Sequence, residues 1–426
     1  MNLPRQNNVE QIELKKSDLL SSGWSCDARK NAYDRLLSSG FPTSRDEYWK
    51  YTNPVTLTKK IVDKSSVIED QAADIFVIAN PVKIVFVNGV FAPEKSDKCD
   101  ASEIAIEQLS DVKELDFHWA KDIYGRYESL SQDPVPRPLA AYNTAFANDG
   151  IVIHVKDCIE RPINIIYENT NEYSDVILHH VIKIDDKAAL TLLENGSAAA
   201  RLNQVMEVEI GESATFNHVR VLGRDHERRV ATHIFGELNS HSKFNSFTLT
   251  VNGLLTRNEC FLNIVGDFAA AHISGACVGD GDFHHDDTVF VTHDSVEAES
   301  RQVFKKVLRN GATGVFQGKI LVKPNAQKTD GYQISQSLLL DEDSQFLAKP
   351  ELEIYADDVA CSHGSTSGAI DEEALFYLTS RGISKLIAID MLTMAFLAEA
   401  VEEIESENLK DIILKLLVSW LDRHRN

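Results

Sequence analysis

The alternation of hydrophobic and polar positions divides the chain into three zones with different periods. Residues 1–138 mix helical and extended patterns, residues 139–370 alternate at every second position in short runs, and residues 371–426 follow the period of amphipathic helices. A change of period of this kind marks a change of architecture. The sequence therefore predicts an N-terminal mixed helical region, a central β domain and a C-terminal helical domain.

The N-terminal zone contains two expected helices and one expected hairpin. Ser25 stands where it can cap a helix over residues 27–38. Residues 82–86 read as a strand that an Asn-Gly turn follows. A second helix is expected over about 115–127, before a proline-rich linker at residues 134–138.

The central zone consists of period-two runs with no amphipathic helices between them. Met206, Val208 and Ile210 alternate with glutamates, and similar runs occur at residues 247–251 and 351–354. Because turn-forming residues bound each run, these runs are expected to be strands. A long series of such strands excludes a doubly wound α/β fold and leaves a sandwich, a barrel or a β-helix. The irregular spacing, without repeated two-residue hairpin turns, favours a β-helix, although no strict repeat period is visible.

Three helices are expected in the C-terminal zone, with Asp371, Ser384 and Ser406 as their caps. The second helix is hydrophobic nearly all round, which predicts that it is buried. The third carries one hydrophobic stripe, formed by Leu409, Ile412, Ile413, Leu416, Leu417, Trp420 and Leu421. This stripe docks on the chain's own core in one interpretation and binds a partner in the other.

Charge and composition exclude some classes of partner. The formal net charge is −22 at pH 7, and nucleic acids and anionic membranes are both polyanions, so neither is an expected partner. No hydrophobic run is long enough to predict a membrane span, and no signal peptide is recognised at the N-terminus. The six cysteines are scattered without a Cys-x-x-Cys pair, which indicates reduced thiols. A cytoplasmic location is expected.

Familiar catalytic motifs are missing from the sequence. It has no P-loop, no dinucleotide-binding glycine motif, no nucleophile elbow and no His-Glu-x-x-His motif. An enzyme that binds its own nucleotide is therefore not expected, and two groups of residues remain as candidates for chemistry.

The first group is His284-His285-Asp286-Asp287, with His293 further along the chain. Imidazole and carboxylate groups are ligands for divalent transition metals. In an extended strand, however, adjacent side chains point to opposite faces and cannot readily share one ion. The group is interpreted as a solvated turn, with a metal site as the alternative.

The second group is Cys361-Ser362-His363-Gly364. In an extended segment the Cys361 thiol and the His363 imidazole share a face, so both can reach one soft metal ion or nascent cluster. Two protein ligands leave such a site half filled, which indicates completion by another chain or transient occupancy. The alternative interpretation is a buried cysteine beside a turn histidine.

Further motifs lie on both sides of this group, at residues 40–52, 139–146, 316–320, 326–333, 349–364, 371–378 and 381–383. In this order they resemble the SufB/SufD family of iron–sulfur cluster assembly proteins. The first block and the Cys-Ser-His-Gly turn are typical of the SufD branch, since SufB is expected to have a longer N-terminal region and Cys-Glu-His-Glu at this place. A SufB-type paralogue is the alternative within the family.

The resemblance implies a right-handed parallel β-helix with an N-terminal helical region and a C-terminal helical domain. It also implies a non-catalytic scaffold that pairs with SufB through the β-helices. By position, His363 would face the SufB interface and share a transient iron–sulfur cluster with a SufB cysteine. Cys361 matches the family cysteine two residues before that histidine.

A second implied partner is the SufC ATPase, bound through the C-terminal helices. The residues expected at this contact are Phe376, Tyr377, Arg381, Leu386 and Met391. ATP would act through SufC, so no permanently bound cofactor is expected in this chain. A flavin in the assembled complex and a homodimer of the isolated chain stay open.

Two functions of other classes also stay open. One is a metal-dependent β-helix hydrolase or lyase that uses residues 284–287, although no convincing set of convergent carboxylates supports it. The other is a homo-oligomeric structural protein. Turnover of a polysaccharide by the isolated chain would favour the first, and gel filtration with and without SufB would distinguish the second.

Overall fold

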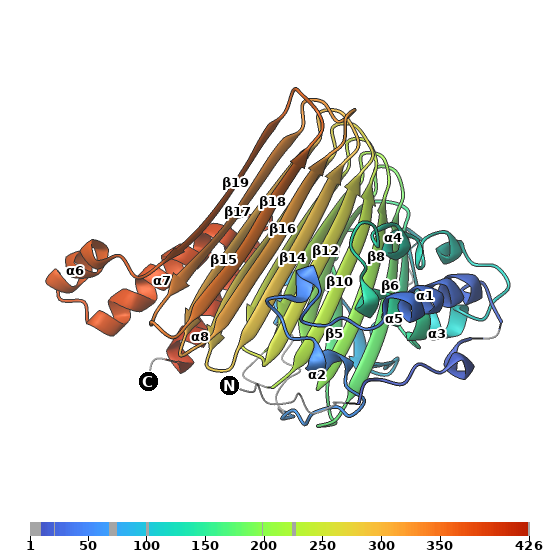
Figure 1. Cartoon of the computed structure of the whole chain (residues 1–426), viewed down its shortest axis with the longest axis horizontal. Helices are drawn as coiled ribbons and strands as arrows, with labels where there is room; N and C mark the ends of the chain where they lie inside the picture. Colours follow the sequence, from blue (N-terminus) through green and yellow to red (C-terminus); the bar gives the residue numbers. More distant parts are fainter. Residues whose placement is uncertain are drawn as a thin grey trace.

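The core of the molecule is a parallel β-helix in which successive strands alternate between two sheets (Figure 1). The computed structural model describes residues 10–20, 22–67, 75–98, 102–197, 199–223 and 227–424. Within them the ten-stranded sheet has the order β19 (Ala360–Gly368), β17 (Asp330–Leu339), β15 (Glu299–Arg309), β13 (Ala270–Asp280), β11 (Lys243–Val251), β9 (Thr215–Leu222), β7 (Ala189–Gly196), β5 (Ile163–Glu168), β1 (Val82–Val87) and β2 (Val90–Phe91). The nine-stranded sheet has the order β18 (Gln345–Ile354), β16 (Thr313–Val322), β14 (His284–His293), β12 (Leu255–Ile264), β10 (Arg229–Leu238), β8 (Arg201–Ile210), β6 (Asp175–Ile184), β4 (Ile151–Val155) and β3 (Ile104–Gln108). The predicted β-helix with flanking N- and C-terminal regions is confirmed.

The repeat of this β-helix is irregular in sequence although it is regular in space. Arg201 pairs with Arg229, Arg229 with Leu255, and Leu255 with His284, so the spacing changes from turn to turn. The corners between the two sheets are built on residues with positive φ that are not glycines: Lys187, Ser213, His241, Phe268, Glu297 and Lys328. Each of them donates its backbone N–H to the following turn. Because glycine does not mark these left-handed positions, the repeat leaves no sequence signal.

The interior between the sheets is mainly hydrophobic but contains a connected row of buried polar groups. The row is formed, in order of contact, by Tyr167, Glu194, Arg220, Thr232, Asn258, Asp287 and Lys306. Burial alone would raise the pKa of Glu194, but Arg220 and His218 together outweigh it and hold that pKa well below its usual range. The charged groups in the interior are therefore paired with one another, which offsets the cost of removing them from water.

Most of the N-terminal region lies on the outer face of the nine-stranded sheet (Figure 1). Its α-helices are α1 (Cys26–Ser39), α2 (Val55–Thr58), α3 (Leu109–Val112), α4 (Arg126–Leu130) and α5 (Pro138–Phe146), and its 3₁₀ helices are η1 (Lys16–Asp18), η2 (Glu47–Trp49), η3 (Val77–Ala79) and η4 (Trp119–Asp122). The expected helix over 27–38 and the hairpin after residues 82–86 are confirmed. The expected continuous helix over 115–127 is wrong, because Gly125 with φ of 72° separates η4 from α4.

The C-terminal helices are α6 (Glu372–Ser380), α7 (Lys385–Val401) and α8 (Glu407–Arg423). The side chains of Asp371 and Ser384 cap α6 and α7 as predicted, whereas Ser406 makes no side-chain cap. The stripe of α8 packs on the outer face of the ten-stranded sheet, so docking on the chain's own core is the correct interpretation. The predicted burial of α7 is wrong for its first half, where Leu386 and Met391 are exposed.

The two ends of the β-helix differ. At the first end β2 pairs antiparallel with β1, and β3 pairs antiparallel with β4. At the other end β18 and β19 are the last strands, and no residue of either strand is buried. The parallel stack thus ends in antiparallel edge strands at one end and in the parallel edge strands β18 and β19 at the other, which we call the open end.

Two further features complete the fold. Within the described ranges no helix has the length and hydrophobicity needed to cross a bilayer. The cysteines at positions 26, 158, 260, 277 and 361 are free thiols, while Cys99 lies outside the described residues. The domain boundaries at residues 138 and 370 stay predictions.

Candidate functional site

Strand β19 places Cys361 and His363 on one face of the last turn. In the parallel register Cys361 pairs with Gly331 and His363 with Gln333, so the two side chains alternate to the same side as the sequence predicts. Cys361 packs with Ile320 of the opposite sheet, which directs this face toward the inside of the open end. A Cβ at position 331 would lie 3.1 Å from the Cys361 Sγ, so the glycine there leaves room for the thiol.

The two side chains differ in accessibility. Cys361 is half-buried, and burial raises the pKa of its thiol. Because the thiolate is the form that binds metal, this burial disfavours Cys361 as a free-standing ligand. His363 is exposed, and no hydrogen bond to another described residue fixes its ring. Of the two, His363 is the group that an approaching chain can reach first.

The described residues do not complete the site. No set of three or more His, Cys, Asp and Glu side chains is grouped for metal binding anywhere in the described part of the chain. A cluster or soft metal ion usually takes four protein ligands, so a Cys-x-His pair at an open edge supplies at most half of them. The remaining ligands would have to come from outside these residues.

The surroundings of the site form an exposed sheet edge. β18 and β19 each hydrogen-bond to a neighbour on one side only, with β16 and β17 respectively. An unpaired edge presents backbone N–H and C=O groups that another strand can satisfy. The candidate ligands therefore lie on a surface that is suited to pairing with a second chain.

The group His284 to Asp287 is neither a solvated turn nor a metal site. It lies in β14, and the alternation of the strand separates it into two pairs on opposite faces. On the outer face Asp286 is ion-paired with Arg257, and on the inner face Asp287 is ion-paired with Lys306. The predicted turn is wrong because these cations and the N-terminal region bury the strand.

His293, the more distant member of this group, is also part of the core. Its Nε2 lies 2.8 Å from the Ser300 Oγ, and burial lowers its pKa to about 4. The histidine is therefore a neutral buried side chain, and the described residues give no support to a hydrolase or lyase site here.

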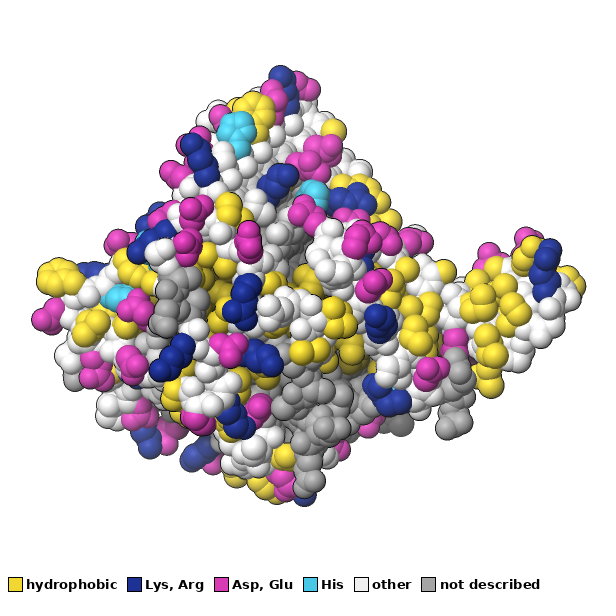
Figure 2. Space-filling model, turned by 180° about the vertical axis from the view of Figure 1, so that it is seen from behind, with side chains coloured by type: hydrophobic (Ala, Val, Ile, Leu, Met, Phe, Trp, Pro, Cys, Tyr) yellow, Lys and Arg dark blue, Asp and Glu magenta, His cyan; other side chains and the backbone are white. Residues whose placement is uncertain are grey.

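The C-terminal arm exposes a cluster of large hydrophobic side chains. α6 has no buried residue, and it projects beyond the sheets together with the start of α7 (Figure 1). Phe376 is 74% exposed, Leu386 56% and Met391 47%. Figure 2 shows hydrophobic side chains gathered on this arm. Arg381 lies over the half-exposed Tyr377 ring at 4.4 Å, so all five residues expected at a partner contact are exposed on this arm.

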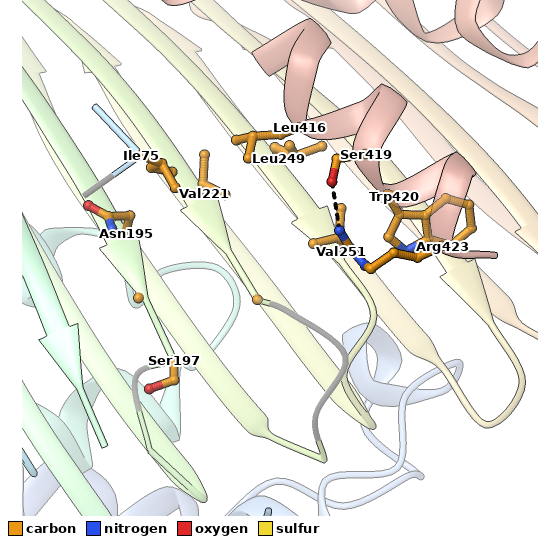
Figure 3. A pocket seen from close by; sticks show the side chains of 12 residues that line it. Ile75, Asn195, Ser197, Val221, Leu249, Val251, Leu416, Ser419, Trp420 and Arg423 are labelled. Atoms are coloured by element: carbon orange, nitrogen blue, oxygen red, sulfur yellow. Dashed lines mark hydrogen bonds between the residues drawn. The ribbon is translucent and has the colours of Figure 1, made fainter. Parts of the chain in front are cut away.

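A small cavity between α8 and the strands β7, β9 and β11 was not predicted from the sequence (Figure 3). It has a volume of about 100 Å³, and hydrophobic side chains such as Leu249 and Val251 line it together with Trp420. Ser419 and Arg423 hydrogen-bond to each other at its rim at 2.9 Å. A space of this size holds only a few water molecules, so it indicates no larger ligand.

Comparisons with known proteins cover nearly the whole chain. Residues 166–396 match the family model described as SUF system FeS cluster assembly, SufBD core domain, and residues 6–165 match the SufBD protein N-terminal region. The chain is 28% identical over 388 residues to the iron–sulfur cluster assembly protein SufD of Escherichia coli, with 89% of each chain covered. It is 24% identical over 406 residues to a SufBD family protein of Synechocystis, covering 90% of this chain and 88% of that one. It is 27% identical over 293 residues to the SufD of Bacillus subtilis, covering 67% and 66%. The chain therefore belongs to the SufBD family of SUF-system iron–sulfur cluster assembly proteins.

Proposed function

We propose that this chain is a SufD-type scaffold subunit that pairs with a SufB-type partner and contributes His363 to nascent cluster formation at their interface. The observation that carries the proposal is the Cys-x-His pair, with its histidine exposed, on the last strand of an open-ended β-helix. The pair is half of a ligand set, and the strand beside it has an unpaired edge. A partner with a similar edge would supply both the missing ligands and the missing strand neighbours.

The SufD assignment within the family rests on local sequence. The Cys361-Ser362-His363-Gly364 segment has serine and glycine where a SufB-type chain is expected to have glutamates. Two of the three relatives described above bear the name SufD. A SufB-type chain is the alternative, and it would be expected to bring a cysteine ligand of its own to the shared site.

The exposed C-terminal arm is the proposed contact with a SufC-type ATPase. Its hydrophobic side chains face solvent instead of the chain's own core, unlike the stripe of α8. Since the sequence has no P-loop, we assign ATP hydrolysis to that partner.

The first experiment tests His363. The variant His363→Ala should form the complex with its SUF partners normally but lower cluster build-up several-fold after anaerobic reconstitution, measured by visible absorption and by bound iron and sulfide. Cys361→Ser should have a smaller effect. The matched control is His272→Ala, which removes a half-exposed histidine from the outer face of the same sheet. Wild-type cluster yield from His363→Ala would remove this residue from the mechanism, and the same spectra would reveal any bound flavin.

The second experiment tests the arm. Replacing Phe376 and Leu386 by serine should abolish retention of the ATPase in a pull-down while leaving pairing with the SufB-type partner intact. Val418→Ser is the matched control, because it removes an exposed hydrophobic side chain from α8, outside the arm. Retention of the ATPase by the double variant would place that contact elsewhere. Deleting the whole C-terminal zone is a poorer test, because α8 is part of the core.

A further inference from the structure

A segment near the N-terminus crosses the outer face of the nine-stranded sheet and reaches its last strand. The segment comprises residues 47–52, which include η2, and is drawn in blue in front of β12 and β14 in Figure 1. Tyr48, Trp49 and Thr52 are buried against the sheet, although the segment has almost no regular secondary structure. Its position must therefore depend on side-chain contacts with the strands below.

Three contacts fasten the segment to the middle of the sheet. The Arg257 guanidinium of β12 stacks on the Trp49 ring at 4.1 Å. The Thr52 hydroxyl donates to Asp286 of β14 at 2.5 Å, and the Gln317 amide of β16 donates to the backbone carbonyl of Tyr48 at 3.1 Å. These groups are buried, so the anchor is screened from water.

Three further contacts tie the same segment to β18. The Tyr48 hydroxyl donates to Glu351 at 2.5 Å, and the Lys349 ammonium group donates to Glu47 at 2.6 Å. The same ammonium group lies 3.9 Å from the centre of the Tyr48 ring. Burial raises the pKa of the Tyr48 phenol, and the Glu351 carboxylate adds to this, so the phenol stays a proton donor at neutral pH.

These contacts tie the segment to a strand that has few other constraints. β18 is an edge strand, it contains no buried residue, and it leads directly into β19, which carries Cys361 and His363. We propose that residues 47–52 form an N-terminal clasp that holds the last turn of the β-helix in register, with Tyr48 as its principal positioning residue. The clasp thus holds the open edge and His363 in place before any other chain binds. This inference concerns the isolated chain and holds or fails independently of the proposed function.

The test is hydrogen exchange of the full-length chain with the variant Tyr48→Phe, which removes one hydroxyl and keeps the ring. A hydrogen bond from a buried phenol to a carboxylate is worth enough to raise the exchange of β18 amides about tenfold. Exchange in β8 and β10 should not change. The matched control is Tyr355→Phe, because the Tyr355 hydroxyl also donates to a carboxylate of β18, that of Glu353 at 2.5 Å, but ties no distant segment to it.

A second variant separates charge from geometry. Glu351→Gln keeps an oxygen acceptor for the Tyr48 hydroxyl but removes the charge, so it should raise exchange in the same strand by a smaller factor. Equal exchange in Tyr48→Phe and Tyr355→Phe would overturn the clasp. So would an increase spread evenly over all strands, or failure of Tyr48→Phe to fold, since each would show that the contact stabilises the whole molecule and not its last turn.

Discussion

The two sheets of the β-helix are covered on their outer faces by different kinds of contact. On the ten-stranded sheet the hydrophobic stripe of α8 packs against Phe247, Leu249 and Val251. On the nine-stranded sheet the N-terminal region packs over buried charges, among which Arg257 is ion-paired with both Glu259 and Asp286. The side chain of Arg257 is wholly buried. One covering layer is thus held mainly by hydrophobic area, and the other by a charge network that the layer itself shields from water.

The difference has an energetic consequence. A mutation in a hydrophobic layer lowers the free energy of unfolding in proportion to the hydrophobic area that it removes. In a buried charge network, a single substitution causes a large loss of stability at once, because it leaves the remaining charges buried without compensation. Burial alone would raise the pKa of Glu259, but Arg257 and His233 lower it instead, so this carboxylate is held in the ionised form. The N-terminal layer should therefore be the more sensitive to single substitutions.

The largest effect is expected from Arg257→Met, which keeps the volume of the side chain but removes the buried cation that pairs with both Glu259 and Asp286. We expect the free energy of unfolding to fall by about 3–5 kcal/mol. A urea titration followed by tryptophan fluorescence measures it. A loss below about 1 kcal/mol would mean that water reaches this network and that the two layers are held alike.

A somewhat smaller effect is expected from Ile413→Ala in the hydrophobic layer. Ile413 is fully buried between α8 and the sheet, so the variant should lose about 2–4 kcal/mol, from the missing contacts and the cavity left behind. The expected signature is faster proteolysis of α8 while the N-terminal layer stays protected. Equal loosening of both layers would contradict the view that they are held separately.

The pH dependence of the N-terminal layer offers a third test. Burial raises the pKa of Glu207 to about 7, and backbone N–H groups of Glu128 and Gly125 limit this rise. Because this value lies above the unfolded value of about 4.3, the contribution of Glu207 to stability is present at low pH and is lost as pH rises from there through about 7. As pH rises from 5 to 8, the free energy of unfolding of Glu207→Gln should therefore increase relative to that of the wild type by on the order of 2 kcal/mol. A constant difference across this range would show that Glu207 keeps one protonation state.

The smallest effect is expected from Arg301→Met, the matched change on the other face. Arg301 forms a bidentate pair with Glu403 of the C-terminal region, but its side chain is 39% exposed. We expect a loss below about 1 kcal/mol in the same urea titration. If Arg301→Met and Arg257→Met destabilise the chain equally, burial does not determine how much each ion pair contributes to stability.

Sequence patterns predicted those features that depend on neighbours in the chain. The caps at Asp371 and Ser384, the stripe of α8 and the shared face of Cys361 and His363 follow from spacings of a few residues. Alternation also identified β8 and β11 as strands, but it did not show that the hydrophobic side of β11 faces the C-terminal helices.

Features that depend on distant residues could not be predicted in this way. The interpretation of residues 284–287 as a solvated turn failed because Thr52, Arg257 and Lys306 bury them from three separate parts of the chain. The Tyr48–Glu351 contact joins residues 303 positions apart, and no local pattern indicates it. The exposure of the hydrophobic start of α7 is set by the absence of anything packed over it among the described residues, which its composition does not reveal.

The unequal ends of the β-helix set a limit on growth. A parallel stack that was open at both ends could add copies without end and form filaments. Here β2 and β3 turn antiparallel at one end, so the parallel pairing of the stack can continue only from β18 and β19. An assembly built through β18 and β19 would therefore have its antiparallel ends outward, where the parallel stack does not continue.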